Sequence, residues 1–344
     1  MRRRASLVLL ALAVFLTALA PLLRWYVFPR MAKVPAGRYQ AVVLEAKDAT
    51  LIDYATLEPR RVSRLTMIQT LKGNVGQADK VKEATGRDVV VWDTLTYAAG
   101  PDGRMVTRIP ERYVFDAHTQ QPVHAGGENV DGTPVRRDGI EYKWPFLVEK
   151  RDYRYFDMMT RTTAPIHYRG TRSFHGLDVY YFEQTIPWTQ VPLPRQLPLG
   201  ISPDTVRQLG LERWYTTQRM FWVDPVTGAP VNGEEIHREE MRWTGHPEKK
   251  PITAFDGHVR MRPDYVDAAV SLVKSQRQLV LLLTDYLPWA FAGLGTGLLA
   301  LSLVLEARGR SRDRRAFGGK RAHDGGKPAR PAPAGEPLSR GGSP

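Results

Sequence analysis

ASLVLLALAVFLTALAPLL at residues 5–23 and YLPWAFAGLGTGLLALSLVL at residues 286–305 are the two stretches that decide how this chain is organised. Neither stretch contains a charged side chain. As α-helices rising about 1.5 Å per residue they would each be roughly 28–30 Å long, which matches a bilayer hydrocarbon core of about 30 Å. Both stretches are therefore predicted to span a membrane, with residues 24–285 forming one domain on a single side of it.

Each predicted span has an alternative. The first could be a cleaved signal peptide, because Ala18-Leu19-Ala20 fits a small-x-small cleavage site. Pro21 directly after that site and the interfacial aromatic residues Trp25, Tyr26 and Phe28 favour retention instead. The second could be a buried core helix, but its length, its lack of charge and the basic segment that follows it favour a membrane span.

Basic residues next to the two spans indicate the orientation of the chain. Residues 2–4 are all arginine, and seven Arg or Lys residues follow the second span within 308–321. Short basic flanks of this kind remain in the cytoplasm. The sequence predicts a protein of the cell (inner) membrane with a cytoplasmic N-terminus (1–4), spans at 5–23 and 286–305, an extracytoplasmic domain (24–285) and a basic, disordered cytoplasmic tail (306–344).

Composition narrows the classes of function. The net charge is +13, but residues 24–285 carry 36 basic and 32 acidic residues, so the excess lies in the flanks. Such flanks favour attraction to anionic membrane lipids over nucleic-acid binding. The chain has no cysteine, and its eight histidines form no His-x-x-x-His or His-Glu-x-x-His pair. Together with the absence of any hydrolase, P-loop, kinase or dinucleotide motif, this predicts no enzymatic activity, no cofactor and no metal site.

The outer domain has the sequence pattern of successive hairpins. Turn signals separate β-branched and aromatic runs at 87–97 and 104–108, at 166–174 and 177–186, and at 219–223 and 231–243, and further strands are predicted at 38–46, 61–71 and 112–115. The predicted fold is mainly β (α+β), an antiparallel sheet, sandwich or open barrel. Helices are expected from Ser202 to about Leu209 and from Asp264 into the second span. The acidic cluster 234–240 around His237 is expected to be a solvated strand face.

One proline-rich segment is too apolar for a solvated linker. It reads IPWTQVPLPRQLPL over residues 186–199, and its prolines disfavour both helix and central strand, so an extended loop is expected. This loop could cover the core, or it could line a groove for an apolar ligand. The candidate groove residues are Trp188, Val191, Leu193, Leu197 and Leu199.

The chain as a whole resembles a known family. The basic N-terminus with its immediate span, the Val34–Gly37 entry, the Phe221–Gly228 turn (FWVDPVTG) with its Val231-Asn232-Gly233 return, and the second span are similar to the actinobacterial porin PorA family of two-span envelope proteins, also classed as a domain of unknown function. The resemblance covers roughly residues 1–308. It implies a porin label, and it also implies a role for some members in handling cell-envelope lipids.

The predicted function is that of a non-enzymatic, two-span envelope protein whose outer domain binds an envelope lipid or lipoglycan and assists its handling or transport. The alternatives are a scaffold that binds other membrane proteins without a ligand and, third, a channel-forming porin. The predicted partners are membrane lipids, such a ligand and other membrane proteins, and no nucleic acid. A ligand binder should contain an elongated apolar cavity between the sheet and the proline-rich loop, whereas a scaffold should have a filled core and an exposed apolar patch.

Overall fold

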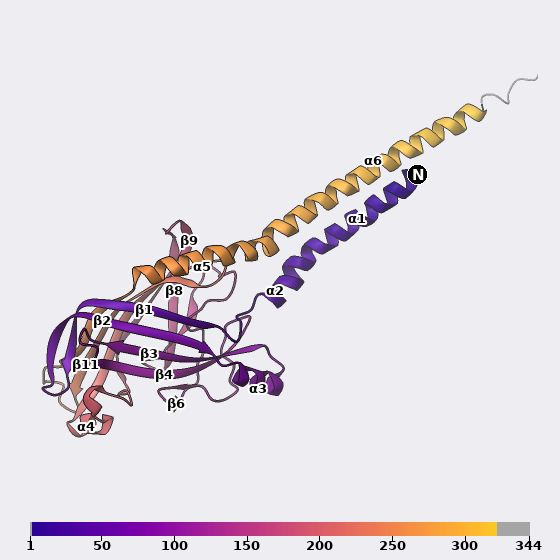
Figure 1. Cartoon of the computed structure of the whole chain (residues 1–344). Helices are drawn as coiled ribbons and strands as arrows, with labels where there is room; N and C mark the ends of the chain where they lie inside the picture. Colours follow the sequence, from indigo (N-terminus) through magenta and orange to yellow (C-terminus); the bar gives the residue numbers. More distant parts are fainter. Residues whose placement is uncertain (1, 322–344) are drawn as a thin grey trace, which may run out of the picture. The chain divides into compact units, whose positions relative to one another are not determined.

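The computed structural model describes residues 2–321, with the side chains of residues 5–308. Two units are distinguished along the chain (Figure 1). One contains residues up to Pro21 together with those from Pro288 onward, and the other contains Leu22–Leu287. The second unit holds the sheet and the candidate site.

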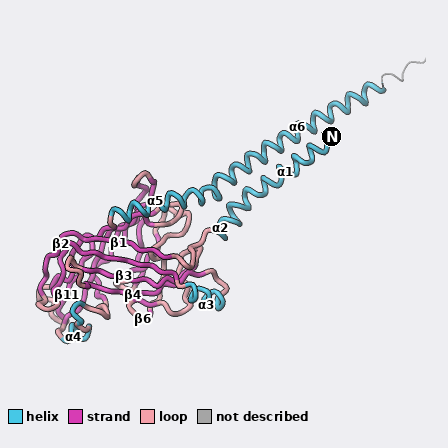
Figure 2. Tube along the Cα trace, viewed as in Figure 1, coloured by secondary structure: helices cyan, strands magenta, loops and turns pink. Residues whose placement is uncertain are grey.

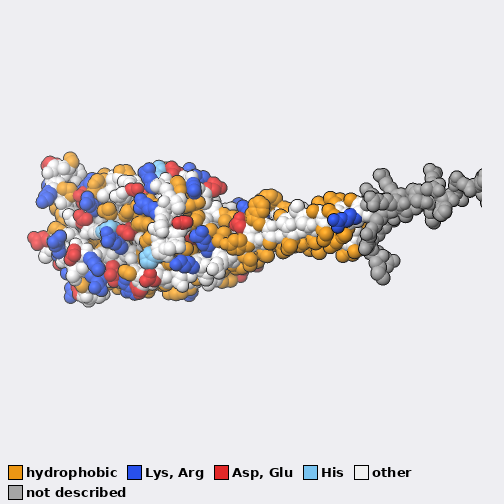
Figure 3. Space-filling view, turned by 90° about the horizontal axis from the view of Figure 1, so that it is seen from above, with side chains coloured by type: hydrophobic (Ala, Val, Ile, Leu, Met, Phe, Trp, Pro, Cys, Tyr) orange, Lys and Arg blue, Asp and Glu red, His pale blue; other side chains and the backbone are white. Residues whose placement is uncertain are grey.

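The first unit is a pair of apolar helices, α1 (Arg2–Leu22) and α6 (Leu287–Arg321). On the face seen in Figure 3, most of the described side chains of this pair of helices are hydrophobic. The uninterrupted helical stretches Ala5–Met31 and Pro263–Arg308 are long and apolar enough to cross a membrane. Helix α6 reaches into the tail predicted to be disordered; residues 322–344 of that tail lie outside the described residues.

Small residues bring α1 and α6 together. A Cβ atom on Gly295 would lie 2.5 Å from Thr17 Oγ1 and 3.1 Å from the Ala13 carbonyl oxygen, so only glycine allows this close approach. The Ser6 and Ser302 hydroxyls lie 3.0 Å apart farther along the pair. Small residues and hydroxyl hydrogen bonds of this kind stabilise helix pairs in lipid, where the hydrophobic effect between helices is absent.

The second unit is built on one antiparallel sheet (Figure 2). In the described part of the chain the sheet has 12 strands in the order β6-β5-β4-β3-β2-β1-β12-β11-β10-β9-β8-β7. The strands are β1 (Tyr39–Asp53), β2 (Glu58–Gly73), β3 (Val89–Ala99), β4 (Met105–Asp116), β5 (Asn129–Val130), β6 (Thr133–Pro134), β7 (Tyr153–Asp157), β8 (Thr162–Phe174), β9 (Leu177–Val191), β10 (Leu211–Val223), β11 (Pro230–Trp243) and β12 (Ile252–Met261). The predicted mainly-β domain between two apolar helices is confirmed as an open antiparallel sheet.

The first and last strands of this unit are neighbours. Leu44 on β1 pairs with Met261 on β12, and the Arg262 amide donates to the Val43 carbonyl at 2.9 Å. The chain therefore enters the sheet and leaves it at the same end. We call this the span-proximal end, because the chain continues from it toward both apolar helices, and we call the opposite end distal.

The sheet curves so that its two halves face each other. Ile109 on β4 shares a buried cluster with Phe156 on β7, Ile186 on β9 and Tyr215 on β10, although these strands lie far apart in the sheet order. The segment between β6 and β7 bridges the two halves. Its Arg137 donates to the Arg112 carbonyl of β4 at 2.9 Å, and its Ile140 exchanges backbone hydrogen bonds with residues 154 and 156 at 2.9 and 3.0 Å.

Four α-helices accompany the sheet in this unit: α2 (Phe28–Met31), α3 (Val75–Thr85), α4 (Pro203–Gln208) and α5 (Pro263–Leu281). Helix α4 begins as predicted, with Ser202 Oγ accepting from the Thr205 amide at 3.1 Å. The 3-10 turn η2 (Pro198–Gly200) precedes it, and the π-helical turns η1 (Leu23–Val27) and η3 (Leu282–Tyr286) precede α2 and follow α5. Pro288 has no amide hydrogen to donate to the carbonyl of Thr284, four residues earlier in the helix. That carbonyl instead accepts a hydrogen bond from Arg24 Nη1 at 2.6 Å.

Part of the proline-rich segment differs from its prediction. Residues 186–191 belong to strand β9 rather than to a loop. The ladder with β10 is irregular there: Thr217 pairs with Ile186, but Tyr215 pairs with Thr189. Pro187 and Trp188 thus lie in a bulge, where the missing proline amide does not interrupt a regular ladder.

Candidate functional site

The curved sheet encloses a cavity of about 1050 Å³. Its wall is predominantly apolar and is formed mainly by the inward-facing side chains of β1–β4 and β10–β12, by the loop before α4, and by α2, α5 and η3. The apolar lining residues from the strands include Val42, Leu44, Leu51, Leu65, Met67, Leu71, Trp92, Ala98, Val106, Ile109, Phe221, Ala254, Phe255, Val259 and Met261.

The cavity is open to the surface, so in solution its apolar wall contacts either water or a ligand. Removing apolar surface from water is favourable by about 25 cal/mol per Å². The wall therefore favours an apolar ligand over water.

The cavity extends along the strands between the two ends of the sheet. At the span-proximal end its lining includes Met31 and Leu279, and at the distal end it includes Leu199. These three residues are 60%, 60% and 64% exposed, so they lie at the rims of the cavity. The apolar space is thus elongated, with lining residues that reach the surface at both ends.

The five predicted groove residues occupy different surroundings. Leu197 and Leu199 line the cavity. Val191 is buried beside Ile109 and Tyr215, and Leu193 packs against the cluster of Leu197 and Val206. Trp188 is partly exposed, with the Arg242 guanidinium 4.8 Å from its ring centre. The last part of the proline-rich segment lines the cavity, whereas its first part belongs to strand β9 and packs against neighbouring strands.

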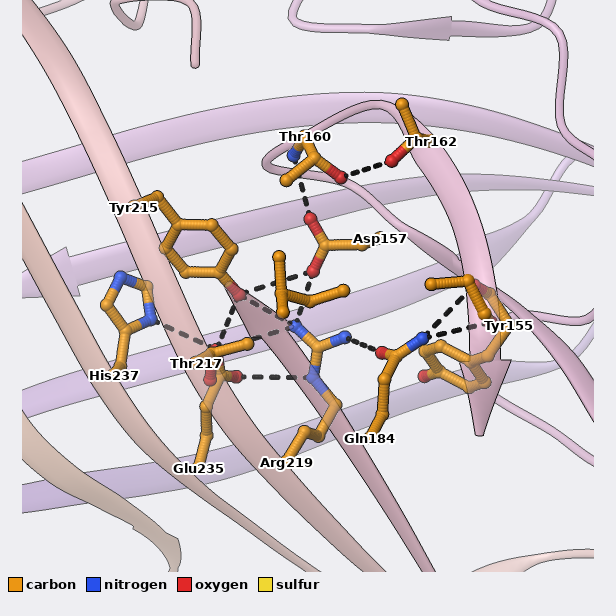
Figure 4. Close-up of polar contacts among 12 residues, drawn as sticks. Tyr155, Asp157, Thr160, Thr162, Gln184, Tyr215, Thr217, Arg219, Glu235 and His237 are labelled. Carbon is orange, nitrogen blue, oxygen red and sulfur yellow. Dashed lines mark hydrogen bonds and ion pairs between the residues drawn. The ribbon is translucent and has the colours of Figure 1, made fainter. Parts of the chain in front are cut away.

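A buried ionic network forms one wall of the cavity (Figure 4). The Arg219 guanidinium on β10 lies 2.9 Å from Asp157, 3.4 Å from Glu235 and 3.1 Å from the Gln184 side-chain oxygen. The Tyr215 hydroxyl donates toward both carboxylates, at 3.2 and 2.9 Å. Because each acid faces a cation or a donor, this network satisfies charges that would be costly to bury alone.

The same wall continues toward the distal end through His237. Its ring nitrogens lie 3.1 Å from Glu235 and 2.7 Å from Glu239, and Glu239 forms a bidentate pair with Arg213 at 2.7 Å for both bonds. Burial lowers the pKa of His237, but the two carboxylates outweigh it and raise that pKa to about 9. For Glu239, burial is likewise outweighed by Arg213 and His237, so its pKa falls to about 2. His237 is consequently a buried cation at neutral pH.

The expectation of a solvated strand face for cluster 234–240 is wrong for its alternate residues 235, 237 and 239. They face inward because β10 presents Arg213 and Arg219 on the same face, and β10 and β11 pair in register. The alternation of Arg213, Tyr215, Thr217 and Arg219 opposite these acids is a signal in the sequence that would have identified the network.

A second buried cluster surrounds Arg137 of the bridging segment, close to the first network: Arg137 lies 4.7 Å from the ring centre of Phe156, the neighbour of Asp157. Fully buried Arg137 pairs with Glu111 at 2.7 Å and Glu141 at 2.8 Å, with Glu128 at 4.0 Å. Burial raises the pKa of both Glu111 and Glu141, and the two acids are too many for one guanidinium. The cluster joins the bridging segment to β4.

The FWVDPVTG motif forms a turn that positions the bridging segment. Asp224 Oδ2 accepts from the Thr227 amide at 2.7 Å and from its hydroxyl at 2.8 Å, which confirms Asp224 as a turn residue. Gly228 has a φ of +71°, and a Cβ atom there would lie 2.3 Å from the Trp144 carbonyl oxygen. The Trp144 amide donates to the Gly228 carbonyl at 2.9 Å. This close contact fixes the neighbouring Lys143 at the cavity wall.

Among the residues that the structure describes, no group of three or more His, Asp or Glu side chains is arranged to hold a metal ion. The fold and the site thus define a class: a curved antiparallel domain around a large apolar cavity, in a chain with two apolar helices.

Comparison with known proteins gives the family. The model of the family described as "Porin PorA" matches residues 5–304, so the chain belongs to the porin PorA family. Two relatives bear the name Porin PorA. The one from Corynebacterium resistens is 25% identical over 289 residues, which covers 62% of this chain and 69% of the relative. The one from Corynebacterium amycolatum is 21% identical over 303 residues, covering 68% and 77%. The family and the two apolar helices together identify a membrane protein of the cell envelope.

Proposed function

We propose that the domain of residues 24–285 binds an envelope lipid, or the acyl part of a lipoglycan, inside the cavity and assists its handling or transport. The observation that carries this proposal is the elongated apolar cavity of about 1050 Å³. Drug-sized ligands occupy sites of about 300–1,000 Å³, so this space suits a large, extended apolar ligand. Such a cavity is what distinguishes a ligand binder from a scaffold with a filled core.

The way the chain is attached supports the same proposal. Two apolar helices leave the domain at its span-proximal end, where Met31 and Leu279 form the cavity rim. We propose that both helices span the cell (inner) membrane, with both termini cytoplasmic and the domain outside, because basic residues flank the spans. In that topology the lipid would come from the outer leaflet of the same membrane.

Pore formation is the function that the relatives' printed name implies, and two observations favour lipid binding over it here. A transmembrane barrel needs a closed ladder and an apolar outer face. In the described residues the ladder remains open between β6 and β7, and outward-facing positions carry charges such as the Glu45–Arg64 pair. Conductance of the purified chain in planar bilayers would support the pore instead.

The test is to fill the cavity. Val42 and Leu44 are half-buried lining residues, and Val42→Trp and Leu44→Trp would place large rings in the space. Lipids that co-purify with the full chain in nonionic detergent would be quantified by mass spectrometry. We expect at least a severalfold loss of bound lipid in both variants.

Ile68→Trp is the matched control, because Ile68 is 37% exposed and is absent from the cavity lining. It should bind lipid as the wild type does. Equal lipid content in all four proteins, or none in the wild type, would contradict the proposal.

A further inference from the structure

We infer that the span-proximal end of the cavity is a binding site for an anionic head group, a carboxylate or phosphate, so that the ligand is an anionic amphiphile. Lys143 and Arg38 would bind the head group, and the apolar wall would bind the chain. This inference rests on the proposed function, because it assigns a ligand class to the same cavity.

Lys143 is a cation in the cavity wall without a carboxylate partner. Its ammonium donates to the carbonyl oxygens of Trp144 and Thr227, both at 2.8 Å, and lies 4.0 Å from the ring centre of Phe146. No carboxylate of the described residues lies within 4.0 Å of it. Burial and, second, the charge of Arg38 lower the pKa of Lys143 to about 7 against the opposing charge of Asp224, which lies beyond 4.0 Å, so the amine is only partly charged at neutral pH without a bound anion. An anion at this point would stabilise the charged ammonium.

Arg38 supplies a second unpaired cation at the same end. It directly precedes β1, lines the cavity, and donates to the Gln40 side-chain oxygen at 3.1 Å. As for Lys143, none of the described acids is close enough to form an ion pair with it. The pKa of Arg38 is lowered by burial. In an apolar wall each of these two positive charges makes the charged form of the other less favourable. A bound anion would stabilise both charges.

Trp92 connects the surroundings of the two cations. It is 4% exposed and lines the cavity. Its backbone pairs with Gly73, whose amide donates to the Arg38 carbonyl at 2.7 Å. Its ring lies 6.2 Å from that of Tyr142, the neighbour of Lys143. Arg38 and Lys143 therefore both lie near this aromatic residue of the cavity wall.

The other buried cations of the domain show what is unusual here. Arg137, Arg213 and Arg219 each have carboxylate partners at 2.7–2.9 Å. A structural role requires such partners, because an unpaired charge in an apolar wall destabilises the fold. Arg38 and Lys143 have none, so their charges remain available to a ligand.

The test compares three probes of equal chain length: hexadecanoic acid, hexadecyl phosphate and hexadecanol. Binding to the full chain would be measured by native mass spectrometry from nonionic detergent. The wild type should bind both anions at least tenfold more tightly than the alcohol. Preference for the acid or for the phosphate would distinguish a fatty-acid ligand from a phosphate-bearing lipid.

Variants then locate the site. Lys143→Met and Arg38→Met should each weaken binding of the anions tenfold or more and leave hexadecanol binding unchanged. Arg60→Met is the matched control, since Arg60 lines the distal part of the cavity, and it should preserve the anion preference.

The outcomes separate the two proposals. Equal binding of all three probes by the wild type would overturn the anionic site and leave lipid binding intact. Anion preference that survives both substitutions, or that is lost equally in Arg60→Met, would overturn the assignment to Lys143 and Arg38. If none of the three probes binds to the wild type, the proposed function itself is contradicted. The wild-type comparison remains decisive even if one variant does not fold.

Discussion

Replacing Arg219 by methionine tests whether the ionic network in the cavity wall maintains the fold. The substitution keeps most of the side-chain volume but removes the cation that contacts Asp157 and Glu235. Asp157 is fully buried and would lose its only cationic partner among the described residues. Breaking a buried pair in this way costs about 3–5 kcal/mol, a large part of the roughly 5–15 kcal/mol that stabilises a domain.

At about 2–4 °C per kcal/mol, the melting temperature of Arg219→Met should fall by roughly 6–20 °C. The assay is thermal unfolding of the full chain in detergent, followed by near-ultraviolet circular dichroism. Arg238→Met is the control. Arg238 lies on neighbouring β11 and pairs with Asp256 at 3.4 Å, but both side chains are at least half exposed, so its loss should cost less than about 1 kcal/mol. A fall for Arg219→Met no larger than that of the control would refute this account of the network.

Three further predictions concern other contacts. His237, which faces Glu235, Glu239, Arg213, Tyr215 and Phe255, has a folded-state pKa of about 9, above its ordinary value near 6.5. Its stabilising contribution should therefore be complete below about pH 6.5 and disappear as the pH rises through 9. Urea titrations should show that the difference in unfolding free energy between wild type and His237→Gln shrinks over that interval. A difference that stays constant would argue against a buried imidazolium. Gly228→Ala should lower the free energy of unfolding by more than 1 kcal/mol, since the residue needs a positive φ and lies against the Trp144 carbonyl, whereas Gly86→Ala, also at positive φ but with open space around it, should cost less. Gly295→Leu should weaken the contact between α1 and α6, measured as loss of a disulfide between cysteines introduced at Ser6 and Ser302, while Gly293→Leu, which meets nothing within 4 Å, should retain it.

Much of the architecture follows from local sequence. The two apolar helices were predictable because a run of nineteen or twenty uncharged, mainly apolar residues is typical of a helix long enough to cross a bilayer. The hairpins and the Ser202 cap were predictable because turn and cap residues act through their own backbone. Strand β12 was not predicted, because Asp256 and Gly257 lower its strand propensity. In the folded sheet glycine is favoured at position 257, because a Cβ atom there would lie only 3.2 Å from the Ala49 Cβ.

The candidate site was less accessible to sequence reasoning. The proline-rich loop was identified as unusual, and Leu197 and Leu199 do line the cavity. Most of the wall comes from strands that look like ordinary half-buried strands, and only the curvature of the sheet turns their faces toward a common space. Lys143 could not be distinguished from a surface lysine, because its position depends on a turn more than eighty residues away in the chain.

Cross-linking inside living cells tests the central claim most directly. A photoreactive benzoylphenylalanine would replace Met67, which lines the cavity, or its neighbour Ile68, which is 37% exposed and lies outside the lining. After irradiation, mass spectrometry of the purified full chain would detect covalent adducts. Lipid binding in the cavity predicts lipid adducts at position 67 and few or none at position 68. Equal lipid labelling at the two positions, or labelling at position 68 alone, would contradict it.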